Sequence, residues 1–203
     1  MKAIKITFIV MTLLGASFAQ AQSAPKTNTK VGMQAMVNAY IKSRTGGTFK
    51  ITKKDLRNGY MKYKSSYTNN MLNFGEFGYY ITSTGMEMLA VTTTFCMQSC
   101  GTSLEFFVYR NNKIQALNQQ IVGMIDMPTF QKKLNKHVEA TMSQKEKASR
   151  ARGDMGLFSV YIKLPQHGTT ILVEKDSRVD NKTSVVAELR YNYNTGRFTF
   201  IKK

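Results

Sequence analysis

The sequence predicts an α+β fold made of two successive halves, each a helix followed by an antiparallel meander of about four strands, in αβ4–αβ4 order. Two segments, 32–47 and 128–153, carry apolar residues at helical spacing. After each of them, runs rich in β-branched and aromatic residues alternate with short groups of turn residues. Helices in such an order are expected to pack on one face of an antiparallel sheet. The halves 32–125 and 126–203 are candidate pseudo-repeats of a single domain, and whether they share one sheet stays open.

The first 21 residues are predicted to be a secretory signal peptide. Two lysines, an apolar run and small residues before a cleavage point follow one another at Lys2, Lys5, Ile6–Leu14, Ala19 and Ala21. The apolar run is shorter than the roughly 20 residues that cross a bilayer as a helix. Residues 22–31 are polar and are predicted to be a flexible mature N-terminus. We therefore expect an exported, periplasmic or extracellular protein whose folded domain spans 32–203 and which is not an integral membrane protein.

The helix of the first half is predicted from apolar residues spaced by three and four, and Gly46 and Gly47 end it. Its apolar face consists of Met33, Met36, Val37, Tyr40 and Ile41. The strands expected after it are 78–82, 86–95, 103–109 and 113–117. The segments between them are short, which is typical of hairpins.

The helix of the second half is predicted to run from Pro128 to Gly153, because proline favours the first turn of a helix and glycine its end. Its apolar residues step by four, at Phe130, Leu134, Val138 and Met142. The strands expected after it are 157–164, 169–175, 184–191 and 197–202. Turn-forming residues such as those of 165–168 separate these strands.

The charge of the chain indicates an anionic partner. The sequence has 29 Lys and Arg against 12 Asp and Glu, a net charge of +17, and loss of Lys2 and Lys5 with the signal peptide leaves +15. Such a surface attracts polyanions over long distances. For an exported protein the candidates are polysaccharide, lipid head groups, nucleic acid or an acidic protein. The alternative is that the charge only keeps the protein soluble.

Cys96 and Cys100 are the two cysteines, and we predict a disulfide between them. The loop is too short for the bond to remove much chain entropy, so its expected effect is to hold one turn. The alternatives are two thiols or a redox or metal pair. Redox pairs usually have two residues between the cysteines, whereas three lie between these.

Two basic segments are the candidate binding sites. The first lies in the stretch 50–67, where lysines, arginine and tyrosines suit an anionic polymer through charge and stacking, at Lys53, Lys54, Arg57, Tyr60, Lys62 and Lys64. Alternation places Tyr60, Lys62 and Lys64 on one strand face and Met61 and Tyr63 on the other. The second is the solvent face of the long helix, at Lys132, Lys133 and Lys136. The alternatives are an edge strand protected by lysines and an ordinary solvated helix face.

Catalytic and metal-binding chemistry has little support in the sequence. The two histidines, His137 and His167, are expected at the core edge and in an exposed turn. Glu76, Glu87 and Glu105 are the only arguable acidic cluster, on neighbouring strands. No nucleophile elbow, metal-ligand motif or phosphate loop occurs in the sequence, so no catalytic residue, metal or cofactor is assigned.

These observations favour an exported, non-enzymatic binding or accessory protein with an anionic partner. A structural subunit of an envelope or secreted assembly is the alternative, and a hydrolase is the least favoured class. The oligomeric state stays open.

Overall fold

The computed structural model describes residues 32–44, 47–67, 72–111, 113–117, 121–122 and 126–203. These residues contain three helices and ten strands. The helices are α1 (Gly32–Ser43), α2 (Met127–Ala140) and α3 (Gln144–Ala151). The strands are β1 (Gly47–Asp55), β2 (Tyr60–Tyr67), β3 (Leu72–Ile81), β4 (Glu87–Cys96), β5 (Cys100–Arg110), β6 (Lys113–Ala116), β7 (Phe158–Lys163), β8 (Thr170–Ser177), β9 (Lys182–Asn192) and β10 (Arg197–Lys202).

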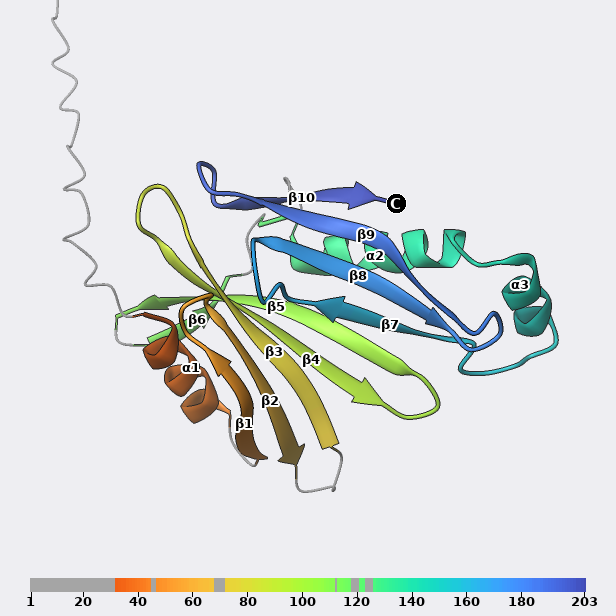
Figure 1. Ribbon diagram of the computed structural model, residues 1–203, viewed down its shortest axis with the longest axis horizontal. Coiled ribbons are helices and arrows are strands. Elements are labelled where there is room, and N and C mark those ends of the chain that lie inside the picture. Colours follow the sequence, from red (N-terminus) through yellow and green to blue (C-terminus); the bar gives the residue numbers. More distant parts are fainter. Residues whose placement is uncertain (1–31, 45–46, 68–71, 112, 118–120, 123–125) are drawn as a thin grey trace, which may run out of the picture.

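The strands form one mixed sheet in the order β1-β2-β3-β4-β5-β7-β8-β9-β10, with β6 paired to β5. Neighbouring strands are antiparallel except β5 and β7, which pair in parallel at Gly101 and Val160. This contact divides the sheet into a first arm, β1 to β6, and a second arm, β7 to β10. Figure 1 shows α1 beside the first arm and α2 and α3 beside the second.

The expected α+β class, with two helix-plus-meander halves and helices on one face of an antiparallel sheet, is wrong. The sheet has ten strands, is mixed and dominates the described residues, while the helices are short. The helices also do not share a face. On β4, Leu89 and Val91 belong to the core cluster of α1, whereas Met88 and Ala90 belong to that of α2. The eight strands expected from the turn residues are present near their expected positions.

The first arm has more strands than expected because the basic stretch also forms a hairpin. Met61 and Tyr63 of β2 are buried in the cluster that contains α1, and Phe49 and Ile51 of β1 pack against it. Lys62 and Lys64 alternate with Met61 and Tyr63 along β2 and so point to the other face of the sheet, where Lys62 contacts Glu76. The expected alternation within β2 is thus confirmed.

The long helix of the second half is two helices, because Ser143 starts a new one. The Ser143 hydroxyl accepts from the Glu146 N–H, and the Glu146 carboxylate accepts from the Ser143 N–H, a capping box. α2 therefore ends at Ala140 and α3 begins at Gln144. Phe130, Leu134 and Val138 of α2 are buried as expected.

The Cys96–Cys100 disulfide is confirmed. It joins the last residue of β4 to the first of β5, which are directly paired in the sheet. The bond closes the β4–β5 turn. Met97, which lies in this turn, is largely exposed. No thiol remains in the described part of the chain.

The predicted signal peptide and the flexible N-terminus, 1–21 and 22–31, lie outside the described residues. Within the part that is described, no helix has the length and apolar character needed to cross a bilayer.

Candidate functional site

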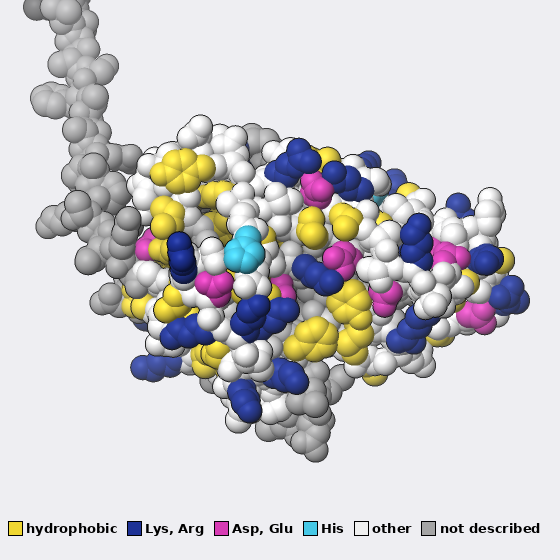
Figure 2. All heavy atoms as spheres, in the orientation of Figure 1, with side chains coloured by type: hydrophobic (Ala, Val, Ile, Leu, Met, Phe, Trp, Pro, Cys, Tyr) yellow, Lys and Arg dark blue, Asp and Glu magenta, His cyan; other side chains and the backbone are white. Residues whose placement is uncertain are grey.

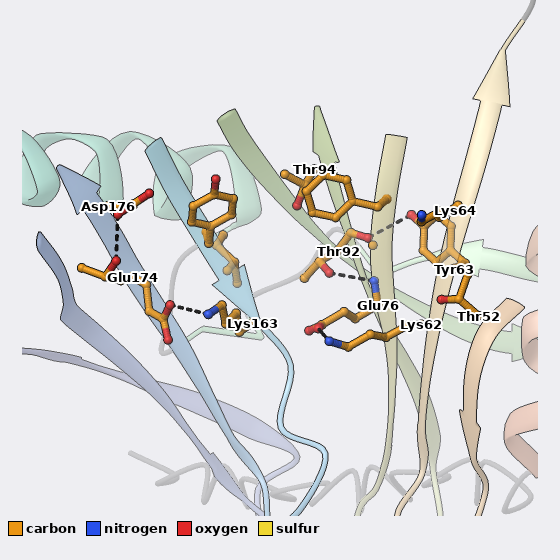
Figure 3. A pocket seen from close by; sticks show the side chains of 15 residues that line it. Thr52, Lys62, Tyr63, Lys64, Glu76, Thr92, Thr94, Lys163, Glu174 and Asp176 are labelled. Atoms are coloured by element: carbon orange, nitrogen blue, oxygen red, sulfur yellow. Dashed lines mark hydrogen bonds and ion pairs between the residues drawn. The ribbon is translucent and has the colours of Figure 1, made fainter. Parts of the chain in front are cut away.

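A cleft of about 500 Å³ lies between the two arms of the sheet. One wall comes from β1 to β4 and the other from β7 to β9, and Figure 3 shows side chains from both walls projecting into the space between them. Its volume is in the range of ordinary ligand pockets. The cleft is open to solvent, so a ligand reaches it without a change in the fold.

Glu76 joins the two walls. Its carboxylate accepts hydrogen bonds from the Tyr60 hydroxyl at 2.7 Å and from the Leu164 N–H, just after β7, also at 2.7 Å. Lys62 Nζ lies 3.5 Å from the same carboxylate (Figure 3). Burial and the hydrogen bond to Glu76 raise the pKa of Tyr60 above its ordinary value, so Tyr60 stays a neutral donor. Glu76 therefore holds the arms together rather than presenting an unpartnered carboxylate to a ligand.

The second wall carries both signs of charge. Lys163 of β7 is ion-paired with Glu174 of β8. The Asp176 carboxylate accepts from the Thr183 hydroxyl at 2.7 Å and has no cationic partner among the described residues. Figure 3 shows Glu174 and Asp176 on the same strand, with Lys163 reaching toward Glu174. This wall thus offers one carboxylate that is available to a ligand.

One face of the β1–β2 hairpin carries four lysines, which we call the lysine quartet: Lys50, Lys53, Lys62 and Lys64. Lys62 and Lys64 line the first wall of the cleft, whereas Lys50 and Lys53 do not line it directly. Lys50 is paired directly with Lys64 in the strand register, and Lys53 is paired with Lys62 across a bulge. Residues opposite each other on neighbouring strands point to the same face, and like charges in such pairs destabilise a sheet. Among the described residues, the Lys62–Glu76 contact is the quartet's one ion pair. Lys53 Nζ instead donates to Gln166 Oε1 at 2.6 Å, in the turn between β7 and β8 of the second arm.

The two predicted basic segments lie on different sides of the molecule. Glu174 and Asp176 of β8 line the cleft, whereas Val173 and Lys175 of the same strand point toward α2 and α3. Helix α2 covers that second face with its apolar residues, so its lysines Lys132, Lys133 and Lys136 point to solvent away from the cleft. Figure 2 shows Lys and Arg side chains spread over the face turned to the viewer, with acidic side chains between them.

The other predicted residues of the first segment are not part of the quartet. Tyr60 is buried and hydrogen-bonded to Glu76. Lys54 is paired with Met61 and so belongs to the opposite face of the hairpin. Arg57 is exposed in the β1–β2 turn.

The histidines and the acidic cluster form no common site. His137 Nε2 lies 2.8 Å from the Val186 carbonyl at the core edge, and His167 is exposed in the β7–β8 turn. Glu105 pairs with Arg44, at the C-terminal end of α1, whereas Glu76 faces the cleft. Among the described residues there is no group of three or more His, Cys, Asp or Glu side chains that could hold a metal ion.

Sequence reasoning missed most of the cleft. Lys50, Phe74, Tyr161, Lys163 and Asp176 were not candidate residues, although all but Lys50 line the cleft directly. Only the alternation in β1, with Phe49 and Ile51 flanking Lys50, could have found one of them. The others meet because the two arms approach each other, which no local pattern encodes.

Comparisons of the chain with protein-family models, with curated proteins and with solved structures find no match.

Proposed function

We propose that this chain is an exported, non-enzymatic binding protein that engages an anionic ligand through the lysine quartet at the cleft. The observation that carries the proposal is the register of β1 and β2, which sets Lys50 opposite Lys64 and Lys53 opposite Lys62. Such pairs cost stability in the unbound protein, and an anion placed between them removes the repulsion. The disulfide supports export, since such bonds persist in oxidising compartments.

The quartet supports this proposal better than the lysines of α2 do. Lys132, Lys133 and Lys136 occupy the solvent face of an amphipathic helix, where charged residues are usual. The quartet instead borders a concavity and includes two of its lining residues, Lys62 and Lys64. A ligand there contacts cations and buries surface at the same time, which a convex helix face does not allow.

The test compares two variants with the same change in net charge. Lys50→Gln/Lys64→Gln removes half of the quartet, and Lys132→Gln/Lys133→Gln removes two lysines of α2. Binding of the folded chain to heparin, polygalacturonate, single-stranded DNA and anionic vesicles is measured by fluorescence anisotropy or co-sedimentation over a range of salt concentrations. Binding that depends on charge weakens as salt rises, with a slope that counts the cations engaged.

We expect the quartet variant to bind at least one of these probes about tenfold more weakly than the α2 variant, with a shallower salt dependence. Equal losses in both variants would show that only net charge matters. Absence of binding to every probe at low salt would overturn the proposal.

A further inference from the structure

The two walls of the cleft differ in charge, and this limits the kind of anion that fits. Lys62 and Lys64 of the quartet, on the first wall, face a second wall on which Asp176 has no cationic partner among the described residues and Glu174 is neutralised by Lys163. A nucleic acid that contacted the quartet would bring phosphates, which only accept hydrogen bonds, toward the Asp176 carboxylate. Grooves for single-stranded nucleic acid are usually positive along their length. The cleft therefore suits a ligand that combines negative charges with neutral groups that donate hydrogen bonds.

Each wall also presents an aromatic ring beside its charged group. Phe74 of β3 is directly paired with Lys64, and its side chain is 43% exposed. Tyr161 of β7 is directly paired with Glu174 and lines the same cleft. A ring that remains exposed next to a charge offers a flat apolar surface to a ligand that carries polar groups at its edges. Phe74 is among the few large apolar side chains exposed in the described part of the chain.

A sugar ring has the shape and chemistry that these groups require. Its C–H faces are apolar, its hydroxyl groups donate hydrogen bonds at the edge, and a uronate adds one carboxylate per ring. Hydrogen bonds to an ionised carboxylate are stronger than those between neutral groups, so Asp176 is a suitable acceptor for sugar hydroxyls. A flat membrane surface, by contrast, reaches only the rim of a concave site.

We infer that the cleft binds a short segment of an acidic polysaccharide of the uronate type, with sugar carboxylates on the quartet, ring faces on Phe74 and Tyr161, and hydroxyl groups on Asp176. This inference rests on the proposed function, because it uses the same lysines. It adds the second wall and the aromatic rings, which a general attraction to polyanions does not need.

The probes are a galacturonate hexamer, the same hexamer with its carboxylates reduced to alcohols, a thymidylate oligonucleotide of equal charge and a hexaglutamate peptide. Calorimetry or a competition assay measures their affinity for the full chain. Asp176→Asn is compared with Asp154→Asn, which makes the same change in charge on an exposed loop outside the cleft. Phe74→Leu is compared with Phe95→Leu, because Phe95 is 49% exposed and does not line the cleft.

We expect the galacturonate hexamer to bind at least tenfold more tightly than the reduced hexamer, the oligonucleotide or the peptide. Asp176→Asn should weaken the galacturonate complex about fivefold and strengthen binding of the oligonucleotide, whereas Asp154→Asn should not weaken the galacturonate complex. Phe74→Leu should weaken the galacturonate complex about fivefold, and Phe95→Leu should leave it unchanged. Circular dichroism spectra and unfolding midpoints establish that all four variants are folded.

Two results would overturn the inference. One is tighter binding of the oligonucleotide or the peptide than of the galacturonate. The other is equal affinity of Asp176→Asn and Asp154→Asn for the galacturonate. If binding to any of these anions still falls in Lys50→Gln/Lys64→Gln, the proposed function survives and only the assignment of a uronate fails. If that variant loses nothing, both fail.

Discussion

Gly75 of β3, in the first wall of the cleft, has no room for a side chain. A Cβ atom there would lie 1.9 Å from the Thr92 carbonyl oxygen and 2.7 Å from Cζ of Tyr63. Tyr63 crosses β3 at this point, and its hydroxyl donates to the Thr92 carbonyl of β4 at 2.9 Å. A glycine in a strand often marks such a close approach. Gly75 thus allows a buried tyrosine to connect β2 to β4 beneath the cleft.

Gly75→Ala is therefore expected to destabilise the protein by about 3 kcal/mol, since the added methyl group forces β3 and β4 apart. The free energy of unfolding is measured by urea denaturation. Gly101→Ala is the matched control, because its Cβ would meet only the Phe95 ring, at 4.0 Å, and its backbone is not in the left-handed region. A loss in Gly101→Ala as large as that in Gly75→Ala would contradict this explanation.

At the scale of elements, α3 is attached to the second arm by a buried ion pair. Lys175 Nζ of β8 lies 2.8 Å from Glu146 Oε2 of α3 and donates to the Thr141 carbonyl at 2.9 Å. Burial opposes ionisation of Glu146, but the hydrogen bonds from Lys175 and the Ser143 N–H outweigh it. They hold the pKa of the Glu146 carboxyl below its ordinary value. The same carboxylate thus completes the cap of α3 and fixes that helix to the sheet.

Lys175→Met is expected to cost about 3–5 kcal/mol in the free energy of unfolding, because it leaves a buried carboxylate without its cation. Arg150→Met is the control, since the Arg150–Glu139 pair is exposed and such pairs contribute at most about 1 kcal/mol. Equal losses in the two variants would show that burial of the pair is unimportant.

The same pair predicts a pH dependence. Because the pKa of Glu146 is lower in the folded chain than in the unfolded chain, the unfolded state binds the proton first as the pH falls. The stabilisation is present above the ordinary value of 4.5 and is lost as the pH falls through the folded value. The advantage of the native chain over Glu146→Gln, whose glutamine still suits the cap, should therefore shrink below pH 4.5. An advantage that stays constant to lower pH would contradict this mechanism.

The elements also show what the sequence could and could not predict. Turn residues located eight of the ten strands, because glycine, proline and asparagine act locally. The sequence contains the Ser143-x-x-Glu146 pattern of a capping box, which indicates a new helix start. The spacing of four between Val138 and Met142 instead favoured one continuous helix. Met142 is buried by packing beyond the end of α2, not as part of that helix. The burial of Met142 thus comes from tertiary packing, although its spacing from Val138 is that of a helix.

At the scale of the whole molecule, the cleft could not be predicted because it depends on how the two arms meet. The face of β2 that carries Lys62 and Lys64 followed from alternation. The pairing of Lys62 with Lys53 depends on a bulge between Ile51 and Lys53, and the second wall depends on the parallel contact of β5 with β7. Neither has a signal at short sequence separation. The sequence therefore indicated some residues of the first wall of the cleft and none of the second wall.

The lysine quartet lowers the stability of the unbound protein but is proposed to bind the anion. The substitution Lys50→Glu tests this conflict between stability and binding. This substitution places a carboxylate opposite Lys64 and replaces a repulsive cross-strand pair by an attractive one. We expect the free energy of unfolding to rise by about 0.5–1 kcal/mol at low salt, and the gain to shrink as salt screens the pair. Binding to polygalacturonate should weaken at least tenfold, because the same residue contributes to the anion site. Lys132→Glu on α2 makes an identical change in net charge away from the cleft and should retain most of the binding. Two results would contradict this conflict. One is a lower stability of Lys50→Glu than of the native chain at low salt, and the other is binding by Lys50→Glu as tight as that by Lys132→Glu.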